Sequence, residues 1–149
     1  MKLMFISDIH GSSLYAQKAI DTYKQEKADK LIILGDILYH GPRNDLPEEY
    51  APKKVISLLN AYKKDIIAVR GNCDAEVDQM VLDFPIRSDF ATVDVDGHHF
   101  FLMVIFLCMV IFINRLLRKL MVSILLILRR FLCLKRERIA MVFMKRILL

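Results

Sequence analysis

Three short apolar runs, each ending in a polar loop, constrain the fold of this 149-residue chain more than any other feature. The runs are KLMFISD (2–8), KLIILGD (30–36) and DIIAVRGNCD (65–74). Each has the length and continuity of a buried strand. Between them, helical spacing of apolar residues extends over 13–28, behind a serine cap, and over 52–64, behind a proline. Strands alternating with helices predict an α/β fold with a mostly parallel sheet.

A second kind of pattern follows the third run. The segment ATVDVDGHHFFLMV (91–104) alternates apolar and polar residues around Asp96-Gly97. An Asp-Gly pair between alternating residues is a strong signal for a two-residue β-turn. We therefore expect a β-hairpin that leads into a fourth core strand.

The composition changes near residue 102. Residues 1–102 carry 12 Lys+Arg and 16 Asp+Glu, a net charge of −4, whereas residues 103–149 carry 10 and 1, a net of +9. No glycine, proline or histidine follows residue 99. Glycine and proline are the usual turn residues, and a natural α/β domain does not lose them in this way. The basic balance therefore belongs to the tail. Because the first part has no basic cluster interleaved with aromatic residues, we expect no dedicated nucleic-acid ligand.

The cysteines and the N-terminus favour a reducing compartment. Cys73, Cys108 and Cys133 are odd in number and show no C-x-x-C spacing, so they indicate neither a disulfide framework nor a zinc ribbon. The start MKLMFISD is too short for the apolar core of a signal peptide and has no small-residue cleavage site. We predict a cytoplasmic protein.

The three polar loops carry side chains suited to metal binding. Asp8 and His10 follow the first run, Asp36 follows the second, and Asn72 follows the third. The carboxyl ends of parallel strands share one edge of a sheet, where ligand sites of α/β folds gather. Carboxylate, imidazole and amide oxygen together suit ions such as Mn²⁺, Fe²⁺ or Zn²⁺. The sequence thus predicts a divalent metal site at this edge.

The motifs D-x-H, G-D and G-N-x-D, in this order, resemble those of the calcineurin-like metallophosphoesterases. The flanks GDILYHGPRNDLPEEYAP (35–52) and AVRGNCDAEVDQM (68–80) are similar to bacterial phosphodiesterases of the YfcE type. The resemblance covers residues 1 to about 102. It implies a β-sandwich core flanked by helices, and an enzyme that hydrolyses small phosphoesters, foremost phosphodiesters, with a metal-bound hydroxide. It is also compatible with a homo-oligomer.

The same resemblance implies two divalent ions, with Mn²⁺ preferred and Zn²⁺, Fe²⁺ or Ni²⁺ as alternatives. On matching positions, Asp8 and His10 would ligate the first ion, Asp36 would bridge both, and Asn72 would ligate the second. Two ions about 3.5–4 Å apart can clamp the oxygens of a phosphoryl group during displacement. Cys73 takes the place of a histidine common in the family. With Asn72, the proposed ligand of the second ion, it makes up the pair of catalytic residues that the resemblance implies.

Three further residues are predicted to bind substrate. His40, Arg43 and Arg70 can meet phosphate oxygens. Each has an alternative: plain loop structure for His40 and Arg43, and pairing with a neighbouring carboxylate for Arg70. Cys73 likewise has the alternative of a small buried side chain.

Two hypotheses address the tail. The family has later His motifs, H-G-H and G-H-x-H, which are missing here. Read one base out of frame, the codons of Met103-Val104 must encode glycine, and the flanking triplets permit histidine on both sides. We therefore divide the chain into residues 1–102, the N-terminal part of a metallophosphoesterase domain, and residues 103–149, an out-of-frame apolar and basic helical tail that replaces the C-terminal half. Weak metal binding and low activity would follow.

The alternative accepts the tail as genuine. Residues 100–113 give 14 uncharged apolar positions, fewer than the roughly 20 that span a bilayer. A helix with basic residues could instead lie on an anionic membrane surface. In that case the protein would be a membrane-associated binding module without catalysis. We expect no membrane contact unless the tail is genuine.

Overall fold

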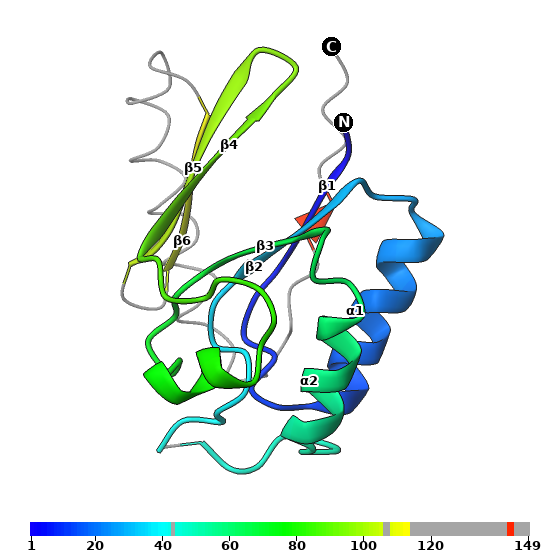
Figure 1. Ribbon diagram of the computed structural model, residues 1–149, viewed down its shortest axis with the longest axis vertical. Helices are drawn as coiled ribbons and strands as arrows, with labels where there is room; N and C mark the ends of the chain where they lie inside the picture. The colour runs from blue at the N-terminus through cyan, green and yellow to red at the C-terminus, as the bar shows by residue number, and fades with distance from the viewer. Residues whose placement is uncertain (43, 106–107, 114–142, 145–149) are drawn as a thin grey trace, which may run out of the picture.

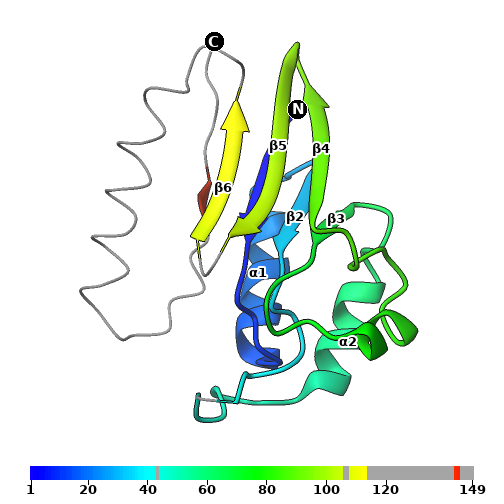
Figure 2. The ribbon, with the colours of Figure 1, turned by 90° about the vertical axis from the view of Figure 1, so that its left-hand side faces the viewer.

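The computed structural model describes residues 1–42, 44–105, 108–113 and 143–144. Its strands form two sheets, one with the order β3-β2-β1-β7 and one with the order β4-β5-β6. Helices α1 and α2 cover one face of the first sheet, and the second sheet lies along its other face (Figures 1 and 2). The α/β class with a sandwich of sheets, predicted from the sequence, is confirmed. In chain order the elements are β1 (Leu3–Ile6), α1 (Ser13–Gln25), β2 (Lys30–Leu34), α2 (Pro52–Asn60), β3 (Ile66–Val69), the 3₁₀-helix η1 (Glu76–Met80), β4 (Phe90–Val95), β5 (His98–Ile105), β6 (Cys108–Ile113) and β7 (Phe143–Met144).

The first sheet is parallel in its centre. Strand β1 pairs with β2 so that Phe5 lies opposite Ile32, and β2 pairs with β3 so that Ile32 lies opposite Ile67. Helices α1 and α2 connect these strands, as the alternating pattern predicts. Among the described strands of this sheet, only the short β7 runs antiparallel, beside β1. The carboxyl ends of β1, β2 and β3 therefore lie at the same edge.

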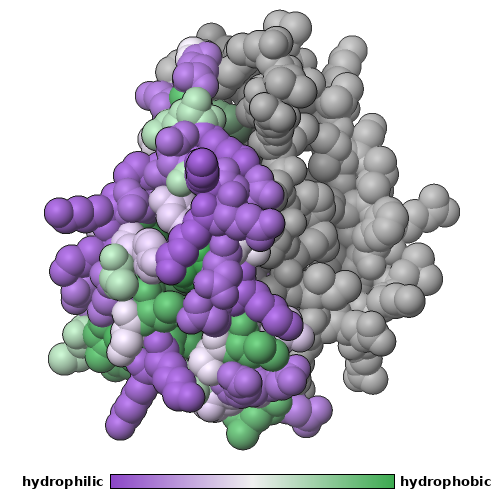
Figure 3. All heavy atoms as spheres, turned by 90° about the vertical axis from the view of Figure 1, so that its right-hand side faces the viewer, coloured by the Kyte–Doolittle hydropathy of each residue, from purple (hydrophilic) through white to green (hydrophobic). Residues whose placement is uncertain are grey.

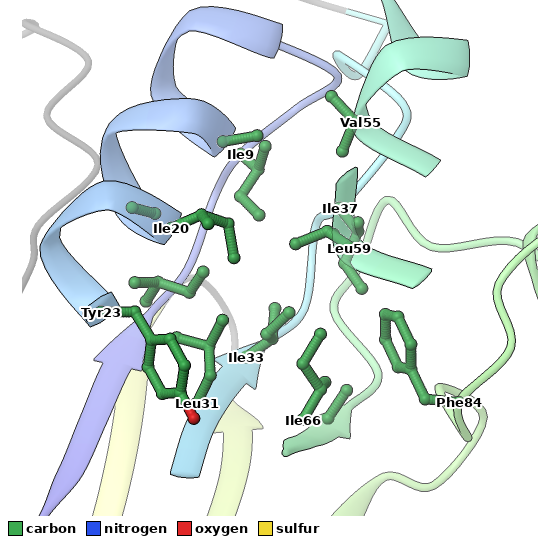
Figure 4. Close-up of a cluster of buried hydrophobic side chains, with 14 of the residues drawn as sticks. Ile9, Ile20, Tyr23, Leu31, Ile33, Ile37, Val55, Leu59, Ile66 and Phe84 are labelled. Atoms are coloured by element: carbon green, nitrogen blue, oxygen red, sulfur yellow. The ribbon is translucent and has the colours of Figure 1, made fainter. Parts of the chain in front are cut away.

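Both faces of this sheet are buried, which explains why its strands are apolar without alternation. Alternate residues point to opposite faces of a strand. One set packs against the helices: Met4, Ile6, Leu31, Ile33, Ile66 and Ala68 against Ala16, Ile20, Tyr23, Val55 and Leu59. Figure 4 shows part of this core, with Leu31, Ile33 and Ile66 of the strands near Ile20, Tyr23, Val55 and Leu59 of the helices. The other set faces the second sheet: Leu3, Phe5, Ile32, Leu34 and Val69 against Val93, Val95, Phe100 and Leu102.

Local signals account for the helices. Ser12 caps α1 by accepting the N–H of Tyr15, and Pro52 occupies the first turn of α2. Both helices turn apolar side chains toward the sheet. Seen from the helix side, the surface is mostly hydrophilic, with separate hydrophobic patches (Figure 3). No helix in the part of the chain that the structure describes is long and apolar enough to cross a membrane.

The predicted hairpin is present, and its strands extend one residue beyond each end of the segment 91–104. Asp96 and Gly97, with φ of 50° and 77°, form the turn between β4 and β5. Strand β5 continues past residue 102 to Ile105, and β6 pairs with it. Where the structure describes residues 103–149, it thus shows strands rather than the expected helix. Runs such as CMVIFI, rich in β-branched and aromatic residues, favour extended structure. Most of the tail lies outside the described residues, and the division at residue 102 stays a prediction.

Candidate metal centre

Three polar loops meet at the carboxyl edge of the parallel strands. They bring His10, Asp36 and Cys73 together, and one ligand atom from each residue lies within 4.8 Å of the other two. These side chains come from the loops after β1, β2 and β3, respectively. The convergence that the sequence predicts is therefore present. The cluster differs from the predicted ligand set, because it contains Cys73 as a candidate metal ligand. The sequence had predicted Cys73 as a catalytic residue only.

His10 is held between two carboxylates. Its Nε2 lies 3.4 Å from Oδ1 of Asp8 and 4.0 Å from Oδ2 of Asp36. Its Nδ1 lies 2.7 Å from the carbonyl oxygen of Tyr39, which accepts a hydrogen bond from a protonated Nδ1. Such a bond fixes the tautomer of a metal-binding histidine and leaves the other nitrogen for the ion. The ring is therefore oriented to present Nε2 to the centre.

The side chains of Asp8, His10 and Asp36 have shifted pKa values. Burial raises the pKa of Asp36; the N–H of Cys73 opposes this shift, and the charges of Asp8 and Asp74 add to it. The hydrogen bond with Asp8 raises the pKa of His10. Burial also acts to raise the pKa of Asp8, but hydrogen bonds from His10 and Ser7 outweigh it, so this pKa is lowered. A buried carboxylate with other acids nearby is an environment that a cation would stabilise.

Backbone strain is concentrated at the same residues. Asp8, His10 and Asp36 have φ of 57°, 48° and 56°, a left-handed conformation that costs non-glycine residues about 1–3 kcal/mol each. Main-chain hydrogen bonds hold the strained segment: the N–H of His10 donates to the carbonyl of Asp36 at 2.9 Å, and the N–H of Asp8 donates to that of Gly35 at 3.3 Å. Strain of this kind is typical of functional sites.

Two glycines allow the loops after β2 and β3 to touch. A Cβ on Gly35 would lie 2.2 Å from the nitrogen of Gly71, and a Cβ on Gly71 would lie 2.2 Å from Oδ1 of Asp36. Gly35 also has a φ of +76°, which side chains rarely adopt. The close approach therefore requires glycine at both positions.

Asn72 and Cys73 lie at the edge of the cluster. The N–H of Cys73 donates to Oδ1 of Asp36 at 2.7 Å, and Nδ2 of Asn72 donates to Sγ of Cys73 at 3.2 Å. Asn72 is exposed, whereas Cys73 is half-buried. Their roles as metal ligand and catalytic residues stay predictions.

The residues predicted to bind substrate, His40, Arg43 and Arg70, do not share one environment. The Arg70 guanidinium lies 3.6 Å from the carboxylate of Glu76, the alternative that the sequence left open. The His40 ring lies between those of Tyr39 and Tyr50, with centroid distances of 4.8 and 5.3 Å, and its buried Nδ1 has no hydrogen-bond partner among the residues that the structure describes. Arg43 lies outside the described residues.

Asp74 is the residue that the sequence analysis missed. It is buried, with 5 % of its surface exposed, and its carboxylate accepts three main-chain N–H groups, two from the loop after β2 and one from its own loop after β3. Its position at the end of the G-N-x-D motif was visible, but nothing in the sequence distinguished a buried acceptor from an ordinary turn former.

The donor set fits a divalent ion. Imidazole, carboxylate and thiol are all metal ligands, and the Asp36 carboxylate is buried at the centre with 4 % of its surface exposed. Asp8 adds a second carboxylate beside His10. An imidazole held from behind by a carbonyl is the arrangement that supports metal ligation. These residues can therefore hold a cation.

The chain is similar to known phosphoesterases. A family model described as calcineurin-like phosphoesterase matches residues 1–138. Phosphodiesterase YfcE of Escherichia coli K12 is 53% identical over 102 residues, which cover 68% of this chain and 55% of that protein, and the protein of the same name from E. coli O157:H7 matches equally. The solved structure of YfcE, a phosphoesterase from E. coli, superposes with a TM-score of 0.70 at 51% identity, over 72% of this chain and 59% of that one.

These matches agree with the order of the motifs and with the loops that form the cluster. The chain spans about half the length of the curated relatives it matches. Since the family model covers most of its residues, the chain belongs to the calcineurin-like phosphoesterase family.

Proposed function

We propose that this chain hydrolyses phosphoesters in a reaction that depends on divalent metal ions, with phosphodiesters as the main substrate class. The observation that carries the proposal is the cluster of His10, Asp36 and Cys73 at the carboxyl edge of the sheet. The similarity to YfcE, a phosphodiesterase by name, supports the choice of substrate class. Mn²⁺ is the ion we would test first, with Zn²⁺, Fe²⁺ and Ni²⁺ next.

In this proposal His10, Asp8 and Asp36 hold one cation, and Asp36 and Asn72 hold a second. Bound divalent ions supply Lewis acidity toward phosphoryl oxygens and make water a competent nucleophile near neutral pH. The chain's own contribution is orientation. The carbonyl of Tyr39 fixes the His10 ring, and the N–H of Cys73 fixes one oxygen of the Asp36 carboxylate.

Substrate contacts are proposed for the groups around this centre. Cys73 and Asn72 lie at the edge of the cluster, where a phosphoryl group held by the cations would meet them. Arg70 lies at the end of β3, with its side chain 40% exposed, so its guanidinium can turn from Glu76 to a phosphate oxygen. We assign the protein to the cytoplasm, with a small phosphoester as its partner.

Low turnover is part of the proposal. No histidine follows residue 99, so residues 100–149 supply no imidazole to the second cation. We therefore expect that cation to bind weakly. Added Mn²⁺ should raise the rate over a wide concentration range, because the weak site fills last.

The decisive assay is hydrolysis of bis-p-nitrophenyl phosphate with and without Mn²⁺. Asp36→Ala should reduce the metal-dependent rate by about 100-fold or more, because it removes the ligand shared by both cations. Asp83→Ala is a suitable control, since Asp83 is exposed and pairs with Lys63 away from the cluster. Metal-dependent hydrolysis that survives Asp36→Ala would refute the proposal. Parallel assays with p-nitrophenyl phosphate separate phosphodiesters from phosphomonoesters.

A further inference from the structure

One buried carboxylate connects the two loops that carry most of the cluster. Oδ2 of Asp74 accepts the N–H of Asp36 at 2.8 Å and the N–H of Gly71 at 2.8 Å, and its Oδ1 accepts the N–H of Ile37 at 2.9 Å. Only 5 % of the Asp74 surface is exposed. Hydrogen bonds from N–H groups to an ionised, buried acceptor are among the stronger ones in proteins.

These three N–H groups lie where the strands have already ended. Strand β2 ends at Leu34 and β3 ends at Val69, so sheet pairing does not satisfy the N–H groups of Ile37 and Gly71. A buried N–H group without an acceptor is costly, so the loops require a group that can accept several bonds. A carboxylate can do so with two oxygens, whereas an amide has only one acceptor oxygen.

Hydrogen bonds link Asp74 and Asp36 in both directions between the two loops. Asp74 holds the main chain of Asp36, and the carboxylate of Asp36 accepts the N–H of Cys73, the residue directly before Asp74. Asp36 has a left-handed φ of 56°, which an unsupported loop would not keep. Displacing the Asp74 carboxylate would therefore release Asp36 and Cys73, two of the three members of the cluster.

We propose that Asp74 is a positioning residue, which fixes the main chain of Asp36 and the turn at Gly71 and thereby holds Asp36 and Cys73 in place for a divalent ion. The inference rests on the proposed function, because it assumes that the cluster binds metal. Asp74 itself need not touch the ion. Outer residues that orient metal ligands typically change metal affinity by about 10–100-fold when they are replaced.

The test is a calorimetric titration of the full chain with Mn²⁺ alone. Asp74→Asn keeps the shape of the side chain but retains one acceptor oxygen, and it should weaken Mn²⁺ binding by about 10–100-fold. Asp74→Glu keeps a carboxylate and should recover most of the affinity. Asp78→Asn is the matched control, because Asp78 also accepts a main-chain N–H, that of Ala75 at 2.9 Å, but in η1. It should bind Mn²⁺ as the unchanged chain does.

The outcomes separate this inference from the proposed function. An unchanged chain that binds no Mn²⁺ overturns both. If Asp74→Asn binds Mn²⁺ as tightly as the unchanged chain does, the positioning role is overturned and the metal site still stands. The midpoint of urea unfolding is measured for each variant, because a merely structural role would lower this midpoint without weakening Mn²⁺ binding by the folded protein.

If Asp74→Asn does not fold, hydrogen exchange of the unchanged chain decides. The amides of Asp36, Ile37 and Gly71 should exchange as slowly as those of β2, since one buried carboxylate protects all three. Exchange as fast as that of an exposed loop would overturn the proposal.

Discussion

Gly35→Ala tests the close approach of the two loops most directly. A Cβ at this position would lie 2.2 Å from the nitrogen and 2.3 Å from the Cα of Gly71. Ordinary contact begins near 3.4 Å, so the main chain of one loop would have to move by roughly 1 Å. Such overpacking costs about 1–3 kcal/mol, and the left-handed backbone adds about 1–2 kcal/mol. The free energy of unfolding should therefore fall by about 2–5 kcal/mol.

Gly97→Ala provides a matched control. Gly97 has a φ of +77°, close to the +76° of Gly35, but an added Cβ there meets no atom of the described part of the chain within 4 Å. Only the backbone term of about 1–2 kcal/mol should appear. Urea denaturation followed by circular dichroism measures both losses, and their difference isolates the contact between the loops. Equal losses for the two variants would refute the reasoning.

Three further predictions concern single side chains. In metal-free protein, His10→Gln should remove a stabilisation that is fully present below pH ~6.5 and is lost as the pH rises through the raised pKa of His10. The reason is that the folded state binds the imidazole proton more tightly than the unfolded state does. Midpoints of urea unfolding measured across this pH range check the prediction. Ser12→Ala should lower stability by about 1–2 kcal/mol in the same assay, because the fully buried hydroxyl caps α1 and donates to a carbonyl at 2.6 Å. Arg70→Ala should raise the KM for bis-p-nitrophenyl phosphate, whereas Arg87→Ala, which removes the other partner of the same glutamate, should not; an equal change in both would assign Arg70 to the ion pair alone.

The sequence was sufficient to predict the framework of the fold. Residues in β1, β2 and β3 are apolar without interruption because both faces of this sheet are covered, and this pattern is visible without coordinates. The capping serine and the proline marked where α1 and α2 begin, and Asp96-Gly97 marked the hairpin. All of these signals are local, which is why they could be recognised in a single chain.

The arrangement of the cluster depended on contacts between distant residues and could not be predicted in detail. The order of the motifs placed Asp8, His10 and Asp36 at one edge, but it gave no distances. Two of the three N–H groups that the buried Asp74 carboxylate accepts lie more than thirty residues away in the sequence. The short helix η1 was also missed, because its residues Glu76–Met80 show no apolar periodicity.

The two faces of the first sheet are completed at different times during synthesis. Elements β1 to β3 and both helices lie within residues 3–69, the last residue of the metal cluster is Cys73, and the core on the helix side is completed by Leu82, Phe84 and Ile86. The face of this sheet opposite the helices, by contrast, is covered by side chains of residues 93–102. Until that hairpin leaves the ribosome, Leu3, Phe5, Ile32, Leu34 and Val69 face water, and an apolar sheet surface of this kind favours aggregation or chaperone binding.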